Sequence, residues 1–284
     1  MQLKAAIKKI SKEKNIAPQL VLQNYMLERF LERVSVSPYL YNFITKGGFL
    51  ISAIIGLDSR TTMDLDATLK HFPVTKEKIE KMIREIIAIN LSDDISFTLR
   101  DIYEIRENDE YSGYRVSLTA NYSPMAVPIK LDITTGDKIT PREIELSYKL
   151  MLENRNIKVF AYNLATILAE KLESIISRGD QNTRPRDYYD VYILSKLQSE
   201  NIDPKTLKDA LLATSKKRGS LAVLKDYEHI IQTVRNSKEM QNLWNNYQLK
   251  FEYANGISFI NVCDSIETLL NQVCSDSPNS IDDH

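Results

Sequence analysis

The sequence predicts an α+β fold, in which a mixed β-sheet core with flanking helices is followed by a C-terminal helical domain. Up to about residue 145, short extended segments alternate with amphipathic helical segments. From Val159 onward, nearly all apolar residues follow the helical period. At 284 residues, the chain is long enough for one large domain or two ordinary ones.

The change in pattern places a domain boundary near residue 150. Residues 1–150 form the expected N-terminal domain, and residues 151–275 form the helical domain, which we expect to complete the functional site. Residues 276–284 are polar and are expected to form a frayed tail.

Local patterns assign the elements of the first half. Pro18 opens a helical pattern. Residues 43–55, FITKGGFLISAII, predict a short strand, a glycine turn and a helix. Thr75 is expected to cap the helix of residues 76–89. Residues 95–105 and 114–122 predict an antiparallel hairpin. A further strand is expected in AVPIKLDITTGD, where a glycine turn ends it.

Composition excludes several classes of protein. The formal net charge of −1 provides no global basic field for non-specific nucleic-acid binding. Cys263 and Cys274 lack metal-ligand spacing, so we expect reduced thiols and a cytoplasmic protein. No apolar run approaches the roughly 18 residues needed to cross a membrane, and the lysine-rich N-terminus lacks the apolar core of a signal peptide.

The stretch TTMDLDATLK places two carboxylates on one face of a predicted strand. Side chains alternate along a strand, so Asp64 and Asp66 point the same way with Cα atoms about 7 Å apart. Met63 and Leu65 are expected to point into the core. Crowding two anions is costly unless a cation meets them, and Mg²⁺ prefers such oxygen ligands.

A second feature is Lys46-Gly47-Gly48 at the predicted strand-to-helix turn. Paired glycines let backbone N–H groups approach a phosphate, and the following helix presents its positive N-terminal end. An ordinary tight turn is the alternative interpretation.

A third feature is Lys130-Leu131-Asp132 on a later strand, where Lys130 and Asp132 share one face. A third carboxylate on a neighbouring strand is what a two-metal site for phosphoryl or nucleotidyl transfer needs. Alternatively, Lys130 simply pairs with Asp132 on an exposed face.

Together these segments resemble the motifs of a known superfamily. KGGFLISAIIGLDSRTTMDLDATLK, residues 46–70, is similar to the first motif of nucleotidyltransferases, a Gly-Gly or Gly-Ser pair followed by Asp-x-Asp. More narrowly, the chain resembles the AbiEii-type toxins, which are related to the MenT toxins. IKLDI (129–133), AEKLESI (169–175) and RPRDYYDVY (184–192) are similar to the second, third and fourth motifs of that family.

The resemblance implies roles for individual residues. Asp64, Asp66 and Asp132 would hold Mg²⁺, and Lys171 would lie near the nucleotide phosphates. Asp187 would lie close to the active site, one helical turn before Asp190. The remaining candidates for nucleotide contact are Lys46, Gly47, Gly48, Arg60, Lys130, Arg186 and Asp190.

For residues of the second half, purely structural roles are alternatives to a role in the site. Lys171 could be a surface lysine paired with Glu170 or Glu173. Asp187 could stabilise the helix start after Pro185. Arg186 departs from the lysine frequent in the family, and its guanidinium would bind phosphate differently.

Two clusters of basic residues have different expected roles. A basic patch is expected to meet triphosphate or an RNA end; its members are Arg178, Arg184 and Arg186. A second set is expected to be a solvated helix face, with RNA contact as the alternative: Lys4, Lys8, Lys9, Lys12 and Lys14.

The resemblance implies a bacterial toxin that transfers a nucleoside monophosphate from an NTP, with GTP one candidate, to the 3′ end of tRNA or to another RNA. Such an activity, of the EC 2.7.7 type, would block translation and growth and act in phage abortive infection. A cognate antitoxin would counteract it without a stable complex. Two alternatives remain: transfer to a protein hydroxyl or a small molecule, and a catalytically inactive nucleotide-binding module.

Overall fold

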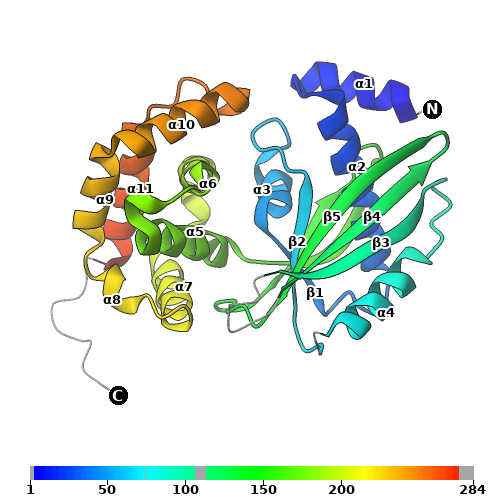
Figure 1. Cartoon of the computed structure of the whole chain (residues 1–284), viewed down its shortest axis with the longest axis horizontal. Coiled ribbons are helices and arrows are strands. Elements are labelled where there is room, and N and C mark those ends of the chain that lie inside the picture. The colour runs from blue at the N-terminus through cyan, green and yellow to red at the C-terminus, as the bar shows by residue number, and fades with distance from the viewer. Residues whose placement is uncertain (1–2, 74, 106–112, 275–284) are drawn as a thin grey trace. The chain divides into compact units, whose positions relative to one another are not determined.

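The computed structural model describes residues 3–73, 75–105 and 113–274. These residues form two compact units, which we describe separately. The sheet unit comprises residues up to 137 together with 143–162, and the helical unit comprises residues 138–142 and those from 163 onward. The described residues confirm an α+β fold (Figure 1).

The sheet unit is built on one mixed seven-stranded sheet with the order β3-β4-β5-β2-β1-β7-β6 among the described residues. The pairs β2–β5 and β1–β7 are parallel, whereas the other neighbouring strands are antiparallel. The strands are β1 (Phe43–Lys46), β2 (Asp64–Leu69), β3 (Ser96–Ile105), β4 (Gly113–Tyr122), β5 (Met125–Thr135), β6 (Ile144–Lys149) and β7 (Asn156–Ala161).

Helices pack on the apolar face of this sheet. Leu65 of β2 and Leu131 of β5 are buried in one hydrophobic core with residues of α2 and α4, such as Phe30 and Ile83. Since side chains alternate, the opposite face of β2 and β5 carries the polar residues. The helices of this unit are α1 (Leu3–Lys14), α2 (Pro18–Ser35), α3 (Gly47–Ile55) and α4 (Lys76–Ile87).

Most of the expected elements of this unit are confirmed. A helix begins at Pro18, and a strand, a glycine turn and a helix follow one another over residues 43–55. Thr75 caps α4, its hydroxyl accepting a hydrogen bond from the Lys78 N–H at 3.4 Å. Strands β3 and β4 form the expected antiparallel hairpin, whose connecting residues 106–112 lie outside the described residues.

Two expectations are wrong. Helical periodicity from Val159 onward fails at its start, because residues 156–161 form β7, with Ile157, Val159 and Ala161 buried alternately. Strand β6 precedes it and was not expected either. Met63 is 48% exposed rather than part of the core, since β2 begins one residue later at Asp64.

The helical unit contains α5 (Leu164–Arg178), α6 (Pro185–Leu197), α7 (Pro204–Lys217), α8 (Leu221–Leu224), α9 (Tyr227–Asn236), α10 (Lys238–Lys250) and α11 (Phe259–Cys274). Short 3₁₀ turns lie at Gly179–Gln181, Ser199–Asn201 and Glu252–Ala254. The polar tail predicted at 276–284 lies outside the described residues.

Both cysteines of the helical unit are free thiols, in agreement with the expectation of reduced cysteines. Burial raises the pKa of Cys263 to about 12, so this thiol stays protonated near neutral pH. Among the helices of the described residues, none combines the length and apolar character that crossing a membrane requires.

Candidate active site

The polar face of the sheet unit gathers the three candidate carboxylates. Asp66 of β2 lies beside Asp132 of β5 in the parallel register, and Asp64 lies beside Lys130. All three carboxylates are partly exposed, and the sheet alternation places them on the same face. Asp132 therefore lies on the strand adjacent to β2, as the sequence led us to expect.

Arg115 neutralises one of these carboxylates. It faces Asp132 across the β4–β5 pair, and its Nε and Nη2 atoms each donate a hydrogen bond of 2.6 Å to one carboxylate oxygen. The hydrogen bonds to Asp132 raise the pKa of the Arg115 guanidinium. Arg115 was not identified from the sequence. Arg115 pairs with Asp132 in place of Lys130, whose pairing with Asp132 was the alternative interpretation, and Lys130 is exposed.

The glycine turn brings backbone against Asp66. Gly47 has a φ of +67°, and a Cβ added there would lie 2.0 Å from Asp66 Oδ2. At Gly48, an added Cβ would lie 3.1 Å from both Arg60 Nη2 and Thr62 Oγ1. Both glycines thus permit close approach of side chains to the first turn of α3.

Arg60 and Lys46 are buried around this turn. The Nη1 atom of Arg60 donates a 2.5 Å hydrogen bond to the Thr61 carbonyl. Lys46 donates a hydrogen bond to Thr134 Oγ1 at 2.7 Å and forms an ion pair with Asp137. The Lys46 ammonium also lies 5.6 Å from the centroid of the Tyr162 ring.

Asp137 is a half-buried residue beside Lys46 that was not identified from the sequence. Burial opposes ionisation of its carboxyl, but Lys46 and hydrogen bonds from Thr134 and Tyr162 outweigh it and lower the pKa of Asp137. In the sequence, Asp137 is marked only by its position directly after Gly136 of the turn that follows β5. A solvated aspartate of an ordinary turn would occupy the same position.

The helical unit holds a separate cluster around Lys171. The Lys171 ammonium lies 2.5 Å from Asp187 Oδ1 and 3.3 Å from Asp190 Oδ2. Ser174 donates a 3.3 Å hydrogen bond to Asp187. Asp190 is fully buried, and Asp187 is nearly so. The α5 and α6 helices thus place one cation between two buried acids.

This arrangement contradicts the alternative that Lys171 pairs with Glu170 or Glu173. Glu170 and Glu173 pair with Arg218 instead, at 3.3 and 2.6 Å. Asp187 is in the first turn of α6, as expected, and is also the hydrogen-bond partner of Lys171.

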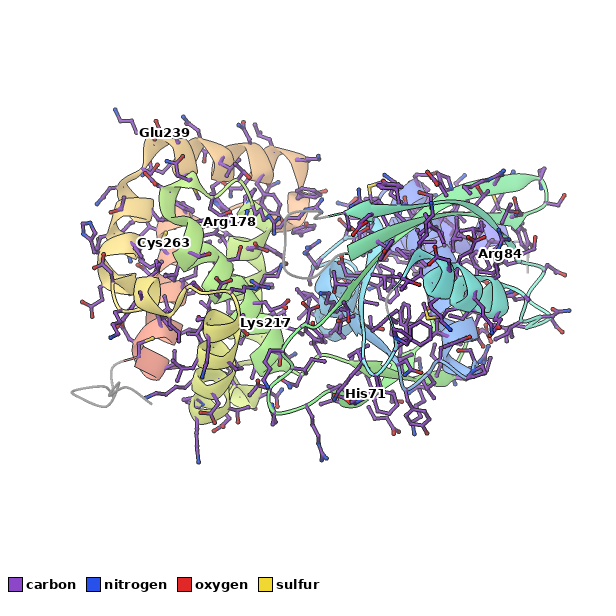
Figure 2. The ribbon with its side chains drawn as sticks, turned by 60° about the horizontal axis from the view of Figure 1, so that its bottom comes forward. His71, Arg84, Arg178, Lys217, Glu239 and Cys263 are labelled. Carbon is purple, nitrogen blue, oxygen red and sulfur yellow. The ribbon has the colours of Figure 1, made fainter. Side chains whose placement is uncertain are left out.

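The predicted basic patch of the helical unit is exposed. Arg178 ends α5, and Arg184 and Arg186 flank Pro185 at the start of α6 (Figure 2 labels Arg178). The Arg186 guanidinium lies 5.1 Å from the centroid of the Phe251 ring, a geometry typical of a cation–π contact.

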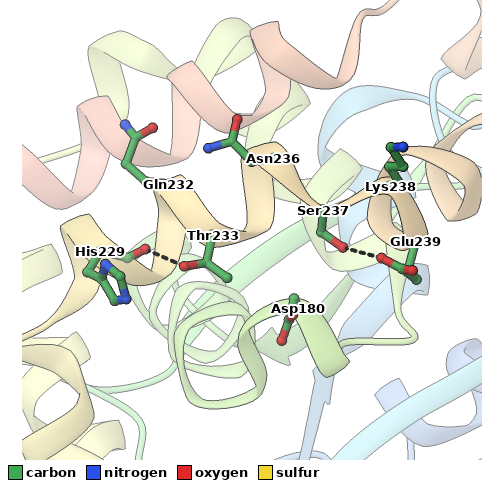
Figure 3. A pocket seen from close by; sticks show the side chains of 8 residues that line it. All are labelled: Asp180, His229, Gln232, Thr233, Asn236, Ser237, Lys238 and Glu239. Atoms are coloured by element: carbon green, nitrogen blue, oxygen red, sulfur yellow. Dashed lines mark hydrogen bonds between the residues drawn. The ribbon is translucent and has the colours of Figure 1, made fainter.

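A shallow hollow of about 630 Å³ lies elsewhere on the helical unit and contains none of the predicted site residues. Polar residues of α9 and α10 line it, together with Asp180 (Figure 3). Local hydrogen bonds join the Thr233 hydroxyl to the His229 carbonyl and the Ser237 hydroxyl to Glu239.

The carboxylate face fits a hard divalent cation in part. Asp64 and Asp66 offer oxygen ligands of the kind that Mg²⁺ prefers. Arg115 engages both oxygens of Asp132, and no group of three potential metal-ligand side chains is assembled within residues 3–73, 75–105 and 113–274. Through their carboxylate oxygens, the two β2 aspartates are the residues of this face that would hold such a metal.

Comparison with solved structures defines the class of fold. A protein from H. pylori, provisionally assigned as a nucleotidyltransferase, aligns with a TM-score of 0.51 at 16% identity, covering 93% of this chain and 100% of that chain. JHP933 from Helicobacter pylori aligns with a TM-score of 0.49 at 17% identity, covering 90% and 94% of the two chains. The first likeness places this chain in the nucleotidyltransferase fold class.

The family follows from a sequence model. The model described as nucleotidyl transferase AbiEii toxin, type IV TA system, matches residues 29–271. The chain therefore belongs to the AbiEii family of nucleotidyltransferase toxins of type IV toxin–antitoxin systems, which confirms the resemblance of its motifs. No curated protein sequence matches the chain significantly.

Because Gly47 contacts Asp66, adding a methyl group at Gly47 should destabilise the protein more than adding one at Gly219. Gly47→Ala adds a clash with Asp66 to the strain of positive φ, whereas Gly219 has a φ of +69° and open space around it. We expect Gly219→Ala to lower the free energy of unfolding by about 1 kcal/mol and Gly47→Ala by about 1–3 kcal/mol more. Urea unfolding measures both; equal losses would contradict the contact.

The Lys46–Asp137 pair predicts a pH dependence of stability. Because the folded state lowers the pKa of Asp137 below 3.8, its stabilisation is present above that pH and is lost as the pH falls through the folded-state pKa. Asp137→Asn, which leaves Lys46 unpaired, should reduce the free energy of unfolding at pH 7 by about 3 kcal/mol and by less at pH 3.

The control for this measurement is Asp101→Asn, which changes an exposed aspartate of β3. Urea unfolding at pH 7, 4 and 3 compares the three proteins. A deficit of Asp137→Asn that stays constant over this range would show that ionisation of Asp137 does not contribute.

Proposed function

We propose that this chain is a Mg²⁺-dependent nucleotidyltransferase that transfers a nucleoside monophosphate from an NTP to an RNA acceptor, namely the 3′ end of tRNA. The observation that carries the proposal is the pair of β2 carboxylates, Asp64 and Asp66, beside the glycine turn of a member of the AbiEii family.

The reaction would form one phosphorus–oxygen bond and break another. The acceptor hydroxyl oxygen attacks the α-phosphorus of the NTP, and the bond between that phosphorus and the oxygen bridging to the β-phosphate breaks. Pyrophosphate leaves, and the hydroxyl proton passes to a carboxylate or to solvent. The chemistry that Mg²⁺ supplies when bound is activation of the hydroxyl and neutralisation of phosphate charge.

In the sheet unit, Asp64 and Asp66 would hold Mg²⁺ through carboxylate oxygens. Gly47 and Gly48 open α3, where unsatisfied backbone N–H groups and the positive end of the helix favour a phosphate group. Asp132 would act as the third acid once Arg115 released it and donated its hydrogen bonds to another anion. A triphosphate is an anion that a guanidinium group binds well.

In the helical unit, Lys171 would supply a cation to the nucleotide phosphates. Asp187 and Asp190 both contact its ammonium, at 2.5 and 3.3 Å, and so restrict its position. Arg186 would add a second, exposed cation. Lys46 of the sheet unit would act on the nucleotide site of that unit indirectly, because Asp137 and Thr134 engage its ammonium.

The proposed biological role follows from the family. Modification of the tRNA 3′ end would prevent aminoacylation and stop translation, which arrests growth and limits phage replication. A separately encoded antitoxin would counteract the toxin in the bacterial cytoplasm without forming a stable complex with it.

The test is label transfer from each α-³²P NTP, with Mg²⁺, into total bacterial RNA and separately into total protein. Wild type is compared with Asp64→Asn and with Asp101→Asn, an exposed β3 aspartate outside the proposed site. We expect label in tRNA-sized RNA, unchanged by Asp101→Asn and reduced roughly 100-fold or more by Asp64→Asn.

The other outcomes are informative. Label confined to protein would replace the RNA acceptor with a protein hydroxyl. RNA labelling that Asp64→Asn leaves intact, or an absence of transfer from all four NTPs, would contradict the proposal.

A further inference from the structure

Helix α1 concentrates positive charge on the surface of the sheet unit. Five lysines and one glutamate lie within Leu3–Lys14, so this helix carries a formal charge of +4 in a chain whose total is −1. All five lysines are exposed. A compact basic feature therefore stands out on a slightly acidic protein.

Three of these lysines form a row. Lys4, Lys8 and Lys12 are four residues apart, which places them on one face of the helix about 6 Å from one another along the axis. Like charges at this spacing repel and weaken a helix, so helix stability does not account for the row. Lys9 and Lys14 pair with Glu13 and Asp58, whereas no acidic partner of the row is found among the described residues.

The opposite side of α1 is anchored in the protein. Leu3, Ala6 and Ile7 are buried, and Leu3 and Ile7 belong to the hydrophobic core of the sheet unit. Helix α1 packs on α2 (Figure 1). A membrane-binding amphipathic helix needs its apolar face for the lipid, and here that face is already covered. The exposed lysines suit a polyanion that lies along the surface.

We propose that the lysine row of Lys4, Lys8 and Lys12 binds the phosphate backbone of the RNA acceptor. This inference rests on the proposed function, since it assumes an RNA substrate. It concerns a region outside the family match, because α1 precedes residue 29. Lysine contacts to phosphate are independent of sequence and fix the register of the nucleic acid rather than its identity. The row therefore contributes to RNA affinity and not to the chemical step.

The test is RNA binding by fluorescence anisotropy, with labelled unfractionated tRNA at 50–200 mM salt. One variant carries Lys4→Gln, Lys8→Gln and Lys12→Gln. Its matched control removes three exposed lysines from α4, where acidic residues are interleaved with the basic ones: Lys76→Gln, Lys78→Gln and Lys81→Gln.

We expect the α1 variant to reduce the slope of log affinity against log salt by roughly 2, because each phosphate contact contributes about 0.7–0.9. Between 50 and 200 mM salt, its affinity should therefore fall roughly 16-fold less than that of wild type. The α4 variant should follow wild type. A third protein, with Lys4→Arg, Lys8→Arg and Lys12→Arg, should also retain the wild-type slope.

Equal effects of the α1 and α4 variants, or an unchanged slope for the α1 variant, would overturn the inference. If the α1 variant lost binding to phosphatidylserine vesicles and kept its binding to tRNA, the lysine row would bind a membrane surface. That result would overturn the inference as well. If wild type labels RNA while the α1 variant binds tRNA normally, this inference fails and the proposed function stands. If wild type neither binds tRNA nor labels RNA, both fail.

Discussion

Repulsion between carboxylates on one face of the sheet is the constraint on which the site depends. The parallel register of β2 and β5 sets Asp66 beside Asp132, with Asp64 two residues earlier on the same face. Slipping either strand by one residue would turn these anions into the core and expose Leu65 or Leu131. The hydrophobic face therefore fixes the acidic face, and the acidic face must be neutralised by cations.

Ion pairs among the described residues neutralise acidic groups in both units. Arg115 engages Asp132 through two hydrogen bonds, while Lys46 is directed to Asp137. In the helical unit, Lys171 lies between Asp187 and Asp190. The more buried of these pairs, at Lys46 and at Lys171, contribute little net stability compared with apolar packing, but losing one partner is costly. They hold charged groups in fixed positions, as binding a highly charged nucleotide requires.

Local signals in the sequence were sufficient for the elements that position the site. The strand–glycine–helix order around Gly47, the cap at Thr75 and the Asp-x-Asp strand depend on neighbouring residues and were predictable. Strand β7 was not, because its six residues run directly into the apolar pattern of α5. The candidate site residues, including Asp187 and Asp190 beside Lys171, were identified from motifs, whereas Arg115 and Asp137 were not. Arg115 and Asp137 meet Asp132 and Lys46 through strand pairing and a turn, which the periodicity of a single segment does not encode.

The most direct test of this account is binding of a divalent metal to the acidic face, measured independently of catalysis. Mn²⁺ is titrated by electron paramagnetic resonance into wild type and into the double variant Asp64→Asn, Asp66→Asn, with Mg²⁺ as competitor. We predict that wild type binds Mn²⁺, that Mg²⁺ displaces it, and that the double variant weakens binding at least roughly tenfold. Equal Mn²⁺ affinity in both proteins would contradict the claim that these two carboxylates share a face in order to hold a metal.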